Sequence, residues 1–231
     1  MFFFPKDPNK KAFCNDAIEK VCAANNFEII FSRDVPVDHS MIGASALATE
    51  PDMVQLFFKP KSSPIYFDLE QSLYFLKTAI MKEVYFKDES LSDDFYIVSL
   101  SAKTLVYKGQ LMATQLRDYF DDLQNEMFES AIAIVHSRFS TNTVPKWKLA
   151  QPFRCIAHNG EINTIQGNIN WWQAREKFMQ KSGIYKDEWV NNLPVCDPYL
   201  SDSGNFDNVV DFLIRTTRSI PHAMMLSLIH I

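Results

Sequence analysis

Apolar and polar positions divide the first sixty residues into alternating strands and helices. Met1 to Phe4 is a short apolar run that we interpret as an inner strand. Asp7-Pro8 then offers a helix cap followed by proline in the first turn. Apolar residues recur at helical spacing after it, at Phe13, Ala17, Val21 and Ala24. Residues 27–32 and 54–59 are predicted strands, and residues 60–64 are predicted to form a turn.

The middle of the chain is less regular. Leu73-Tyr74-Phe75 fits either a helix or a strand. Residues 95–100 and 103–107 predict a hairpin, and residues 111–120 predict a short helix. Ala131 to Val135 (Ala-Ile-Ala-Ile-Val) is a continuous apolar run, which is typical of a fully buried strand.

Two helices are predicted near the end. Residues 165–180 have a helical pattern, and Lys181-Ser182-Gly183 is typical of a helix end, because glycine adopts the left-handed conformation easily. Ser201 to Ser203 can cap a further helix. One buried face of that helix would carry Phe206, Val209, Val210, Leu213 and Ile214. No repeat or low-complexity linker interrupts the chain, so we expect a single α+β domain.

Composition indicates an intracellular enzyme and excludes other classes. The 231 residues are 47% hydrophobic, enough for a substantial core, and the net charge of -5 argues against nucleic acid or a membrane surface as partner. The longest apolar runs fall far short of the roughly 20 residues that span a bilayer. No secretion signal is recognisable at the start.

Two polar segments carry the candidate chemistry. His-Ser-Arg-Phe-Ser-Thr-Asn-Thr (136–143) follows the predicted buried strand, which would deliver Arg138 to one end of a sheet, where Ala-His-Asn-Gly-Glu-Ile-Asn-Thr (157–164) can meet it. Arg138 can hold a carboxylate with two parallel hydrogen bonds, although an arginine that pairs with a structural acid looks the same in sequence. Asn159 and Gly160 can donate to a developing oxyanion, although Asn-Gly is also common in hairpin turns.

Asp202 is the third candidate. At the start of a helix its carboxylate is stabilised by free backbone N-H groups and can bind an ammonium group. A simple helix cap would look identical.

Together with Gly-Asn-Ile-Asn-Trp (167–171) and Ser-Asp-Ser (201–203), these segments resemble the glutaminase domain of glutamate synthase, a class II glutamine amidotransferase. The resemblance implies that Arg138 holds the α-carboxylate of L-glutamine, Asp202 holds its α-ammonium, and Asn159 with Gly160 forms the oxyanion hole. It implies a four-layer αββα N-terminal-nucleophile hydrolase sandwich. The motifs of another class II enzyme, such as an amidophosphoribosyltransferase, match these segments less well.

The resemblance also implies the setting of the domain. Ammonia from glutamine would pass through a tunnel to 2-oxoglutarate in the remaining synthase domains of the same polypeptide. Those domains would hold FMN and an iron-sulfur cluster, whereas this chain itself would hold no cofactor and no metal. The enzyme would work in the cytoplasm, or in a plastid of a photosynthetic eukaryote.

The chain departs from the family in its nucleophile, a cysteine at the mature N-terminus, since it opens Met-Phe-Phe-Phe. We therefore expect residues 1–225 to be a partial amidotransferase domain that lacks its first strands, and residues 226–231 to be a non-native tail. The isolated piece is expected to be inactive and, through an open sheet edge, poorly soluble. The alternative is a non-catalytic module of the same fold that binds an amino acid or a partner.

Other reactive residues offer no competing site. The four cysteines, Cys14, Cys22, Cys155 and Cys196, are too far apart for a zinc ribbon or a redox pair, and the first two fit one buried helix side. A Cys155-His158 dyad is disfavoured because their odd offset puts them on opposite faces of a strand. His136, His158 and His222 lack metal-ligand spacing. The Trp171-Trp172 pair is interpreted as packing.

Overall fold

The computed structural model describes residues 1–62, 68–140, 143–160, 162, 164–216 and 218–226. The strands are β1 (Phe2–Phe4), β2 (Phe27–Asp34), β3 (Asp52–Pro60) and β4 (Tyr96–Ile97). The helices are α1 (Pro8–Ala24), α2 (Ala44–Ala48), α3 (Leu69–Lys87), α4 (Leu116–Tyr119), α5 (Gln166–Ser182), α6 (Asp187–Val190), α7 (Asp202–Arg215) and α8 (Ile220–Met225). Short 3-10 helices cover His39–Met41, Glu89–Ser92, Asp121–Gln124 and Trp147–Leu149.

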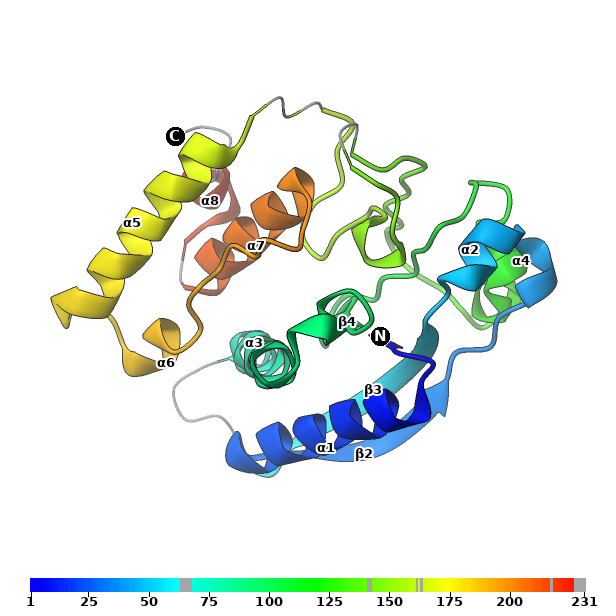
Figure 1. Ribbon diagram of the computed structural model, residues 1–231, viewed down its shortest axis with the longest axis horizontal. Helices are drawn as coiled ribbons and strands as arrows, with labels where there is room; N and C mark the ends of the chain where they lie inside the picture. The colour runs from blue at the N-terminus through cyan, green and yellow to red at the C-terminus, as the bar shows by residue number, and fades with distance from the viewer. Residues whose placement is uncertain (63–67, 141–142, 161, 163, 217, 227–231) are drawn as a thin grey trace.

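The strands form one antiparallel sheet in the order β2-β3-β1-β4, so β1 is an inner strand, as predicted (Figure 1). Side chains alternate across a strand, and the two faces of β1 enter different cores. Phe2 and Phe4 pack with residues of α1 and α3 in one core. Phe3 packs on the other face, with Met53, Tyr96 and Trp147.

Helix α1 confirms the first helical prediction. The Asp7 side chain accepts hydrogen bonds from the backbone N-H groups of Asn9 and Lys10, both at 2.9 Å, and so caps the helix. Cys14 and Cys22 are buried on its inner side, as expected of core residues. The ambiguous stretch around Tyr74 belongs to the helix α3.

Helices α3, α5 and α7 share a third core that includes Tyr74, Trp172 and Phe212. Gly183 ends α5 with a φ of 63°, the left-handed conformation predicted there. The packing role predicted for the tryptophan pair is confirmed for Trp172, which is 1% exposed, but is wrong for Trp171, which is 70% exposed.

The predicted buried strand at 131–135 is wrong. These residues form no strand, and Ile132, Ile134 and Val135 are 80%, 67% and 72% exposed. An apolar run becomes a buried strand only where a neighbouring strand pairs with it and other elements cover both its faces. The four strands of the described sheet pair with one another and leave this run outside.

The predicted hairpin at 95–107 is also wrong, because β4 pairs with β1 and residues 103–107 form no strand. Local polar contacts turn the chain at this point instead. The Glu70 carboxylate accepts the Ala102 N-H at 2.7 Å, and the Ser101 hydroxyl accepts the N-H groups of Lys103 and Thr104. The helix predicted at 111–120 is confirmed only for its last part, α4.

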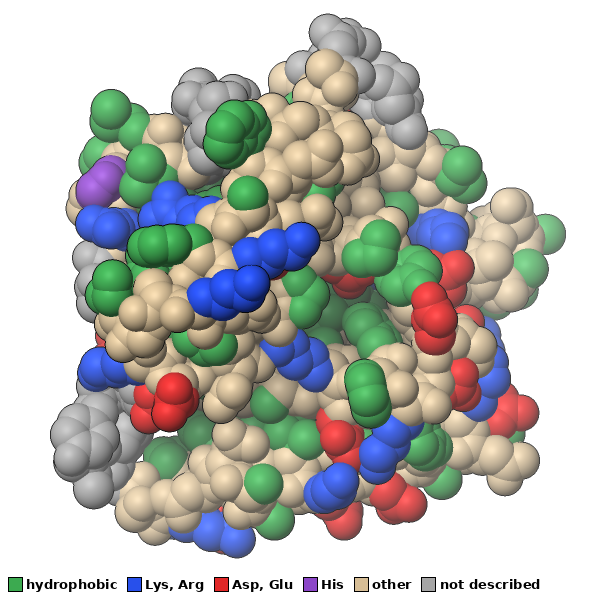
Figure 2. Space-filling model, turned by 60° about the vertical axis from the view of Figure 1, so that its left-hand side comes forward, with side chains coloured by type: hydrophobic (Ala, Val, Ile, Leu, Met, Phe, Trp, Pro, Cys, Tyr) green, Lys and Arg blue, Asp and Glu red, His purple; other side chains and the backbone are tan. Residues whose placement is uncertain are grey.

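The α+β class is confirmed. Figure 2 shows one face of the molecule, hollowed near its centre, with apolar side chains on the floor of the hollow and charged side chains around it. No helix among the described residues is both long enough and apolar enough to cross a membrane. The end of the predicted turn (63–64) and the tail from 227 lie outside the described residues.

Candidate functional site

Helix α7 holds the segment that leads into the second polar motif (157–164). Its Asp207 is fully buried and accepts the backbone N-H groups of Cys155 and Ile156 at 2.7 and 3.1 Å. The Arg154 guanidinium lies 3.4 Å from the other Asp207 oxygen and donates to the Tyr96 hydroxyl at 2.8 Å. The chain that leads into His158-Asn159-Gly160 is thereby attached to α7 and to the sheet.

A buried ion cluster continues along the same helix. Lys77 of α3 donates to the Asp211 carboxylate at 2.6 Å, and Arg154 lies 3.8 Å from the same oxygen. Burial raises the pKa of Asp211, but the positive charges of Lys77 and Arg154 outweigh it and hold that pKa at about 2. Burial and the repulsion of Arg154 lower the pKa of Lys77. Asp211 is therefore ionised at neutral pH.

His158 has a hydrogen-bond partner at every polar atom. Its backbone N-H donates to the buried Gln151 side chain at 3.0 Å, and its carbonyl lies 2.7 Å from His136 Nε2. Its ring Nδ1 accepts the Gly160 N-H at 3.2 Å, and its Nε2 lies 2.8 Å from the Ser203 hydroxyl. Both its backbone and its ring are fixed by contacts to other segments.

His136 makes the corresponding contacts in the first motif. Its Nδ1 accepts the backbone N-H of Arg138 at 3.1 Å, as His158 does for Gly160. Its Nε2 reaches across to the His158 carbonyl. The two motifs are therefore brought together by hydrogen bonds, whereas the sequence analysis expected a strand to do so.

Ser203, in the first turn of α7, joins both motifs to Asp202. The Ser140 hydroxyl donates to the Ser203 hydroxyl at 2.6 Å, and Asp202 Oδ1 accepts from the Ser203 N-H at 2.6 Å and from its hydroxyl at 3.2 Å. A serine hydroxyl has one proton, which is used on Asp202, so Ser203 must accept from His158 Nε2. This pattern assigns the Nε2-H tautomer of neutral His158, in agreement with the acceptor role of Nδ1.

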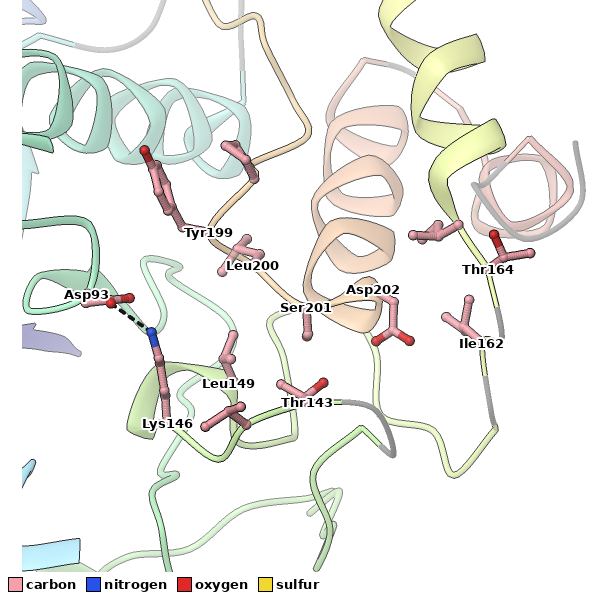
Figure 3. A pocket seen from close by; sticks show the side chains of 13 residues that line it. Asp93, Thr143, Lys146, Leu149, Ile162, Thr164, Tyr199, Leu200, Ser201 and Asp202 are labelled. Carbon is pink, nitrogen blue, oxygen red and sulfur yellow. Dashed lines mark hydrogen bonds and ion pairs between the residues drawn. The ribbon is translucent and has the colours of Figure 1, made fainter.

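Of the four predicted site residues, Arg138, Gly160 and Asp202 take part in these hydrogen bonds, and Asn159 takes part in none of those described above. Arg138, Asn159 and Gly160 are exposed. Asp202 is half-buried and lines a cavity of about 500 Å³, a volume in the range of small-ligand sites. Figure 3 shows its carboxylate pointing from the start of α7 into this cavity. The other three residues do not line the cavity, although Thr143 and Ile162 of the same motifs do.

An ion pair forms the opposite side of the cavity. Lys146 donates to Asp93 at 2.7 Å, and buried Lys148 lies 3.0 Å from the other Asp93 oxygen (Figure 3 shows the first contact). The hydrogen bond from Lys146 holds the pKa of Asp93 below its ordinary value. The cavity thus has the Asp202 carboxylate on one side and the paired charges of Lys146 and Asp93 across from it. The Asp202 carboxylate suits a ligand that carries an ammonium group.

The four cysteine thiols are not activated for nucleophilic attack. Burial raises the pKa of Cys14 to about 12, of Cys22 to about 11 and of Cys196 to about 12. Desolvation and the nearby carboxylates of Asp211 and Asp207 raise the pKa of Cys155. Since the thiolate is the nucleophile, these four thiols are poor candidates for it. The described part of the chain also holds no group of three His, Cys, Asp or Glu residues placed to bind a metal ion.

Sequence reasoning missed the residues that connect the site. His136, Ser140, His158 and Ser203 were noted as motif members or possible metal ligands, but not as hydrogen-bond partners of the site. The signal was present in the repeated spacing, because His136-x-Arg138 and His158-x-Gly160 each place a histidine two residues before a candidate. The partners across the loops could not be inferred from that spacing.

Comparison with known proteins identifies the family of the chain. The chain belongs to the class II glutamine amidotransferases, a family that matches residues 1–229. It is 40% identical over 226 residues to the ferredoxin-dependent glutamate synthase, chloroplastic, of Oryza sativa subsp. japonica, covering 98% of this chain and 14% of the relative. It is 41% identical over 235 residues to glutamate synthase [NADH] of Saccharomyces cerevisiae, covering 97% of this chain and 11% of the relative.

A bacterial relative gives the same result. The glutamate synthase [NADPH] large chain of Azospirillum brasilense is 40% identical over 213 residues, covering 92% of this chain and 14% of the relative. The resemblance inferred from the motifs is therefore confirmed. The chain spans about one seventh of the length of these relatives, or less.

Proposed function

We propose that this chain is the glutamine-binding part of a glutamate synthase and that L-glutamine occupies the cavity at the start of α7. The carrying observation is that Asp202 points into a cavity that is also lined by Thr143, Ile162 and Thr164 of the two polar motifs. The family membership defines the reaction class, and the similarity to three glutamate synthases narrows it.

Each candidate residue has a role that its chemistry supports. The Asp202 carboxylate would bind the α-ammonium group, since Oδ2 makes no hydrogen bond to the described residues. Arg138 would close over the ligand and hold its α-carboxylate with two parallel hydrogen bonds, and its exposed position leaves it free to do so. The Asn159 amide and the Gly160 N-H would face the carbonyl oxygen of the side chain, where negative charge develops during hydrolysis. The Gly160 N-H, which donates to His158 Nδ1 at 3.2 Å, would then share its proton between the ring nitrogen and that oxygen.

Hydrolysis of L-glutamine and water to L-glutamate and ammonia requires a nucleophile that the described thiols do not provide. We infer that a cysteine outside these 231 residues supplies it, with a second sheet that completes the four-layer sandwich. The remaining domains of the synthase would then join the ammonia to 2-oxoglutarate and would hold FMN and an iron-sulfur cluster. The alternative is a module of this fold that binds an amino acid without catalysis.

Similarity in this domain does not distinguish the electron donors of whole glutamate synthases. Relatives named for ferredoxin, NADH and NADPH are all about 40% identical to it. We propose a plastid or a cytoplasmic location, since the relatives include enzymes named chloroplastic and a yeast enzyme.

Calorimetric titration of the chain with L-glutamine tests the binding proposal. Asp202→Asn keeps the acceptor for Ser203 but removes the charge, and it is expected to weaken binding about 10- to 100-fold, the value of one charge-assisted hydrogen bond. Asp187→Asn is the matched control, because Asp187 is also the first residue of a helix, α6, and lies outside the cavity. Equal loss in both variants, or no saturable binding by the unchanged chain, would refute the assignment of the site.

A hydrolysis assay separates the two functional alternatives. The enzyme hypothesis predicts glutaminase activity once the coding sequence is extended to include a cysteine nucleophile. A longer protein that binds L-glutamine but releases no ammonia would favour the non-catalytic module.

A further inference from the structure

The hydrogen bonds around His158 connect two parts of the site that the mechanism treats separately. Gly160 belongs to the proposed oxyanion hole, and Asp202 to the proposed ammonium site. The path between them runs from the Gly160 N-H to His158 Nδ1, from His158 Nε2 to the Ser203 hydroxyl, and from Ser203 to the Asp202 carboxylate. Every link in this path is a direct hydrogen bond between 2.8 and 3.2 Å.

We propose that His158 is a positioning residue that fixes the Asn159-Gly160 backbone relative to the Asp202 carboxylate through Ser203. This inference rests on the proposed function and assigns His158 no contact with the reacting atoms. It acts through its neighbours, and the neutral Nε2-H tautomer is the form that satisfies both of its ring contacts.

The need for such a residue follows from the exposure of the loop. Asn159 and Gly160 are exposed, and a glycine next to an exposed residue leaves the backbone free to take many conformations. No sheet or helix holds them. An oxyanion donor that is not held in place must be ordered when the ligand binds, and this ordering weakens affinity. The hydrogen bond from Gly160 to His158 Nδ1 holds the loop and reduces that cost, because the ring is also held at Nε2 by Ser203 and the His158 backbone is held at its N-H and its carbonyl.

The surroundings of His158 support a positioning role over a simple packing role. Its ring lies 6.1 Å from the Phe206 ring in an edge-on arrangement, so its plane is fixed by α7. Ser203 is fully buried and Ser140 is nearly so, which means that water cannot easily replace their hydrogen bonds. His136 reinforces the arrangement by donating to the His158 carbonyl.

Two substitutions separate the two ring contacts of His158. In His158→Asn the side-chain oxygen stands near the position of Nδ1, so the bond to Gly160 is kept and that to Ser203 is lost. In His158→Gln the amide reaches the position of Nε2, so the bond to Ser203 is kept and that to Gly160 is lost. His222→Gln is the control, because His222 is an exposed residue of α8.

The first readout is the hydrogen-exchange rate of the Gly160 amide, measured by NMR on the full 231-residue chain. We expect exchange at least about 10-fold faster in His158→Gln than in the unchanged chain, and close to the unchanged rate in His158→Asn. Ring nitrogen shifts of His158 are expected to show the proton on Nε2. Equal Gly160 exchange in the two variants, or a proton on Nδ1, would overturn the proposal.

The second readout is the dissociation constant of L-glutamine. Each His158 variant is expected to bind about 3- to 10-fold more weakly, as for the loss of one neutral hydrogen bond, whereas His222→Gln binds normally. Unchanged or tighter binding in His158→Gln would mean that His158 Nδ1 competes with the ligand for the Gly160 N-H, and would overturn the proposal. Absence of binding by the unchanged chain counts against the proposed function, while the exchange rates still decide the positioning claim.

Discussion

The sheet with helices α1 and α3 is fixed by the burial of apolar side chains, whereas the segments around His136 and His158 are fixed by individual hydrogen bonds to each other and to α7. In the first region Phe2, Phe4 and Phe95 are fully buried between the sheet and two helices. In the second region Arg138, Asn159 and Gly160 are exposed, and the contacts that matter are polar. Stability and ligand binding should therefore respond to substitutions in different regions.

The contrast in stability between the two regions is tested most directly at Phe2. Phe2→Ala removes a fully buried ring from the inner strand and is expected to lower the free energy of unfolding by about 3–5 kcal/mol. Ile132→Ala, in the exposed apolar run, is expected to change it by less than about 0.5 kcal/mol. Urea unfolding of both variants measures the two values. A large loss in Ile132→Ala would show that this run is buried after all.

The buried ion cluster is the place where the two regions meet. Arg154→Met leaves the carboxylates of Asp207 and Asp211 without a shared cation, and it is expected to cost about 3 kcal/mol or more, because an unpaired buried charge is strongly destabilising. The exposed Arg117 is the control, and Arg117→Met should stay within about 0.5 kcal/mol. A similar, small effect in both variants would contradict the structural role of the cluster.

The stability of the chain at low pH tests the contribution of Asp211 to this cluster. The folded-state pKa of Asp211, about 2, lies below the ordinary value near 3.8, so the unfolded chain binds the proton more readily between these values. The contribution of Asp211, about 2–3 kcal/mol, is fully present above roughly pH 4 and is lost as the pH falls toward 2. In Asp211→Asn this part of the acid-induced loss should disappear. Asp187→Asn, on the surface, should follow the unchanged chain, and identical acid profiles for both variants would refute the assignment.

The spacing of apolar residues correctly predicted the helices that bury one of their faces. The Asp7 cap with its helix and the capped helix that begins after Ser201 were predicted because their apolar spacing and end signals lie within one segment. The run at 131–135 was predicted wrongly, since strand formation depends on a partner that the run itself does not reveal. The site residues were identified from the sequence motifs, and the structure places Asp202 in the lining of the cavity and the other three outside it.

The hydrogen bonds between segments of the site could not be predicted from the sequence. Ser203 and Gln151 contact His158 from positions 45 and 7 residues away, and such contacts depend on how loops pack. By contrast, the contact of His158 with Gly160 is local, and the same spacing in His136 and Arg138 suggests that it is a recurring way to order these loops.

The central claim is that the two motifs and the start of α7 form one site for L-glutamine. Its most direct test is an NMR titration of the isotopically labelled chain with L-glutamine, following the backbone amides. The account predicts saturable shifts with one dissociation constant at Arg138, Gly160 and Ser203, and none in the sheet strand around Phe3. Saturable shifts elsewhere, or three separate dissociation constants for these residues, would contradict it.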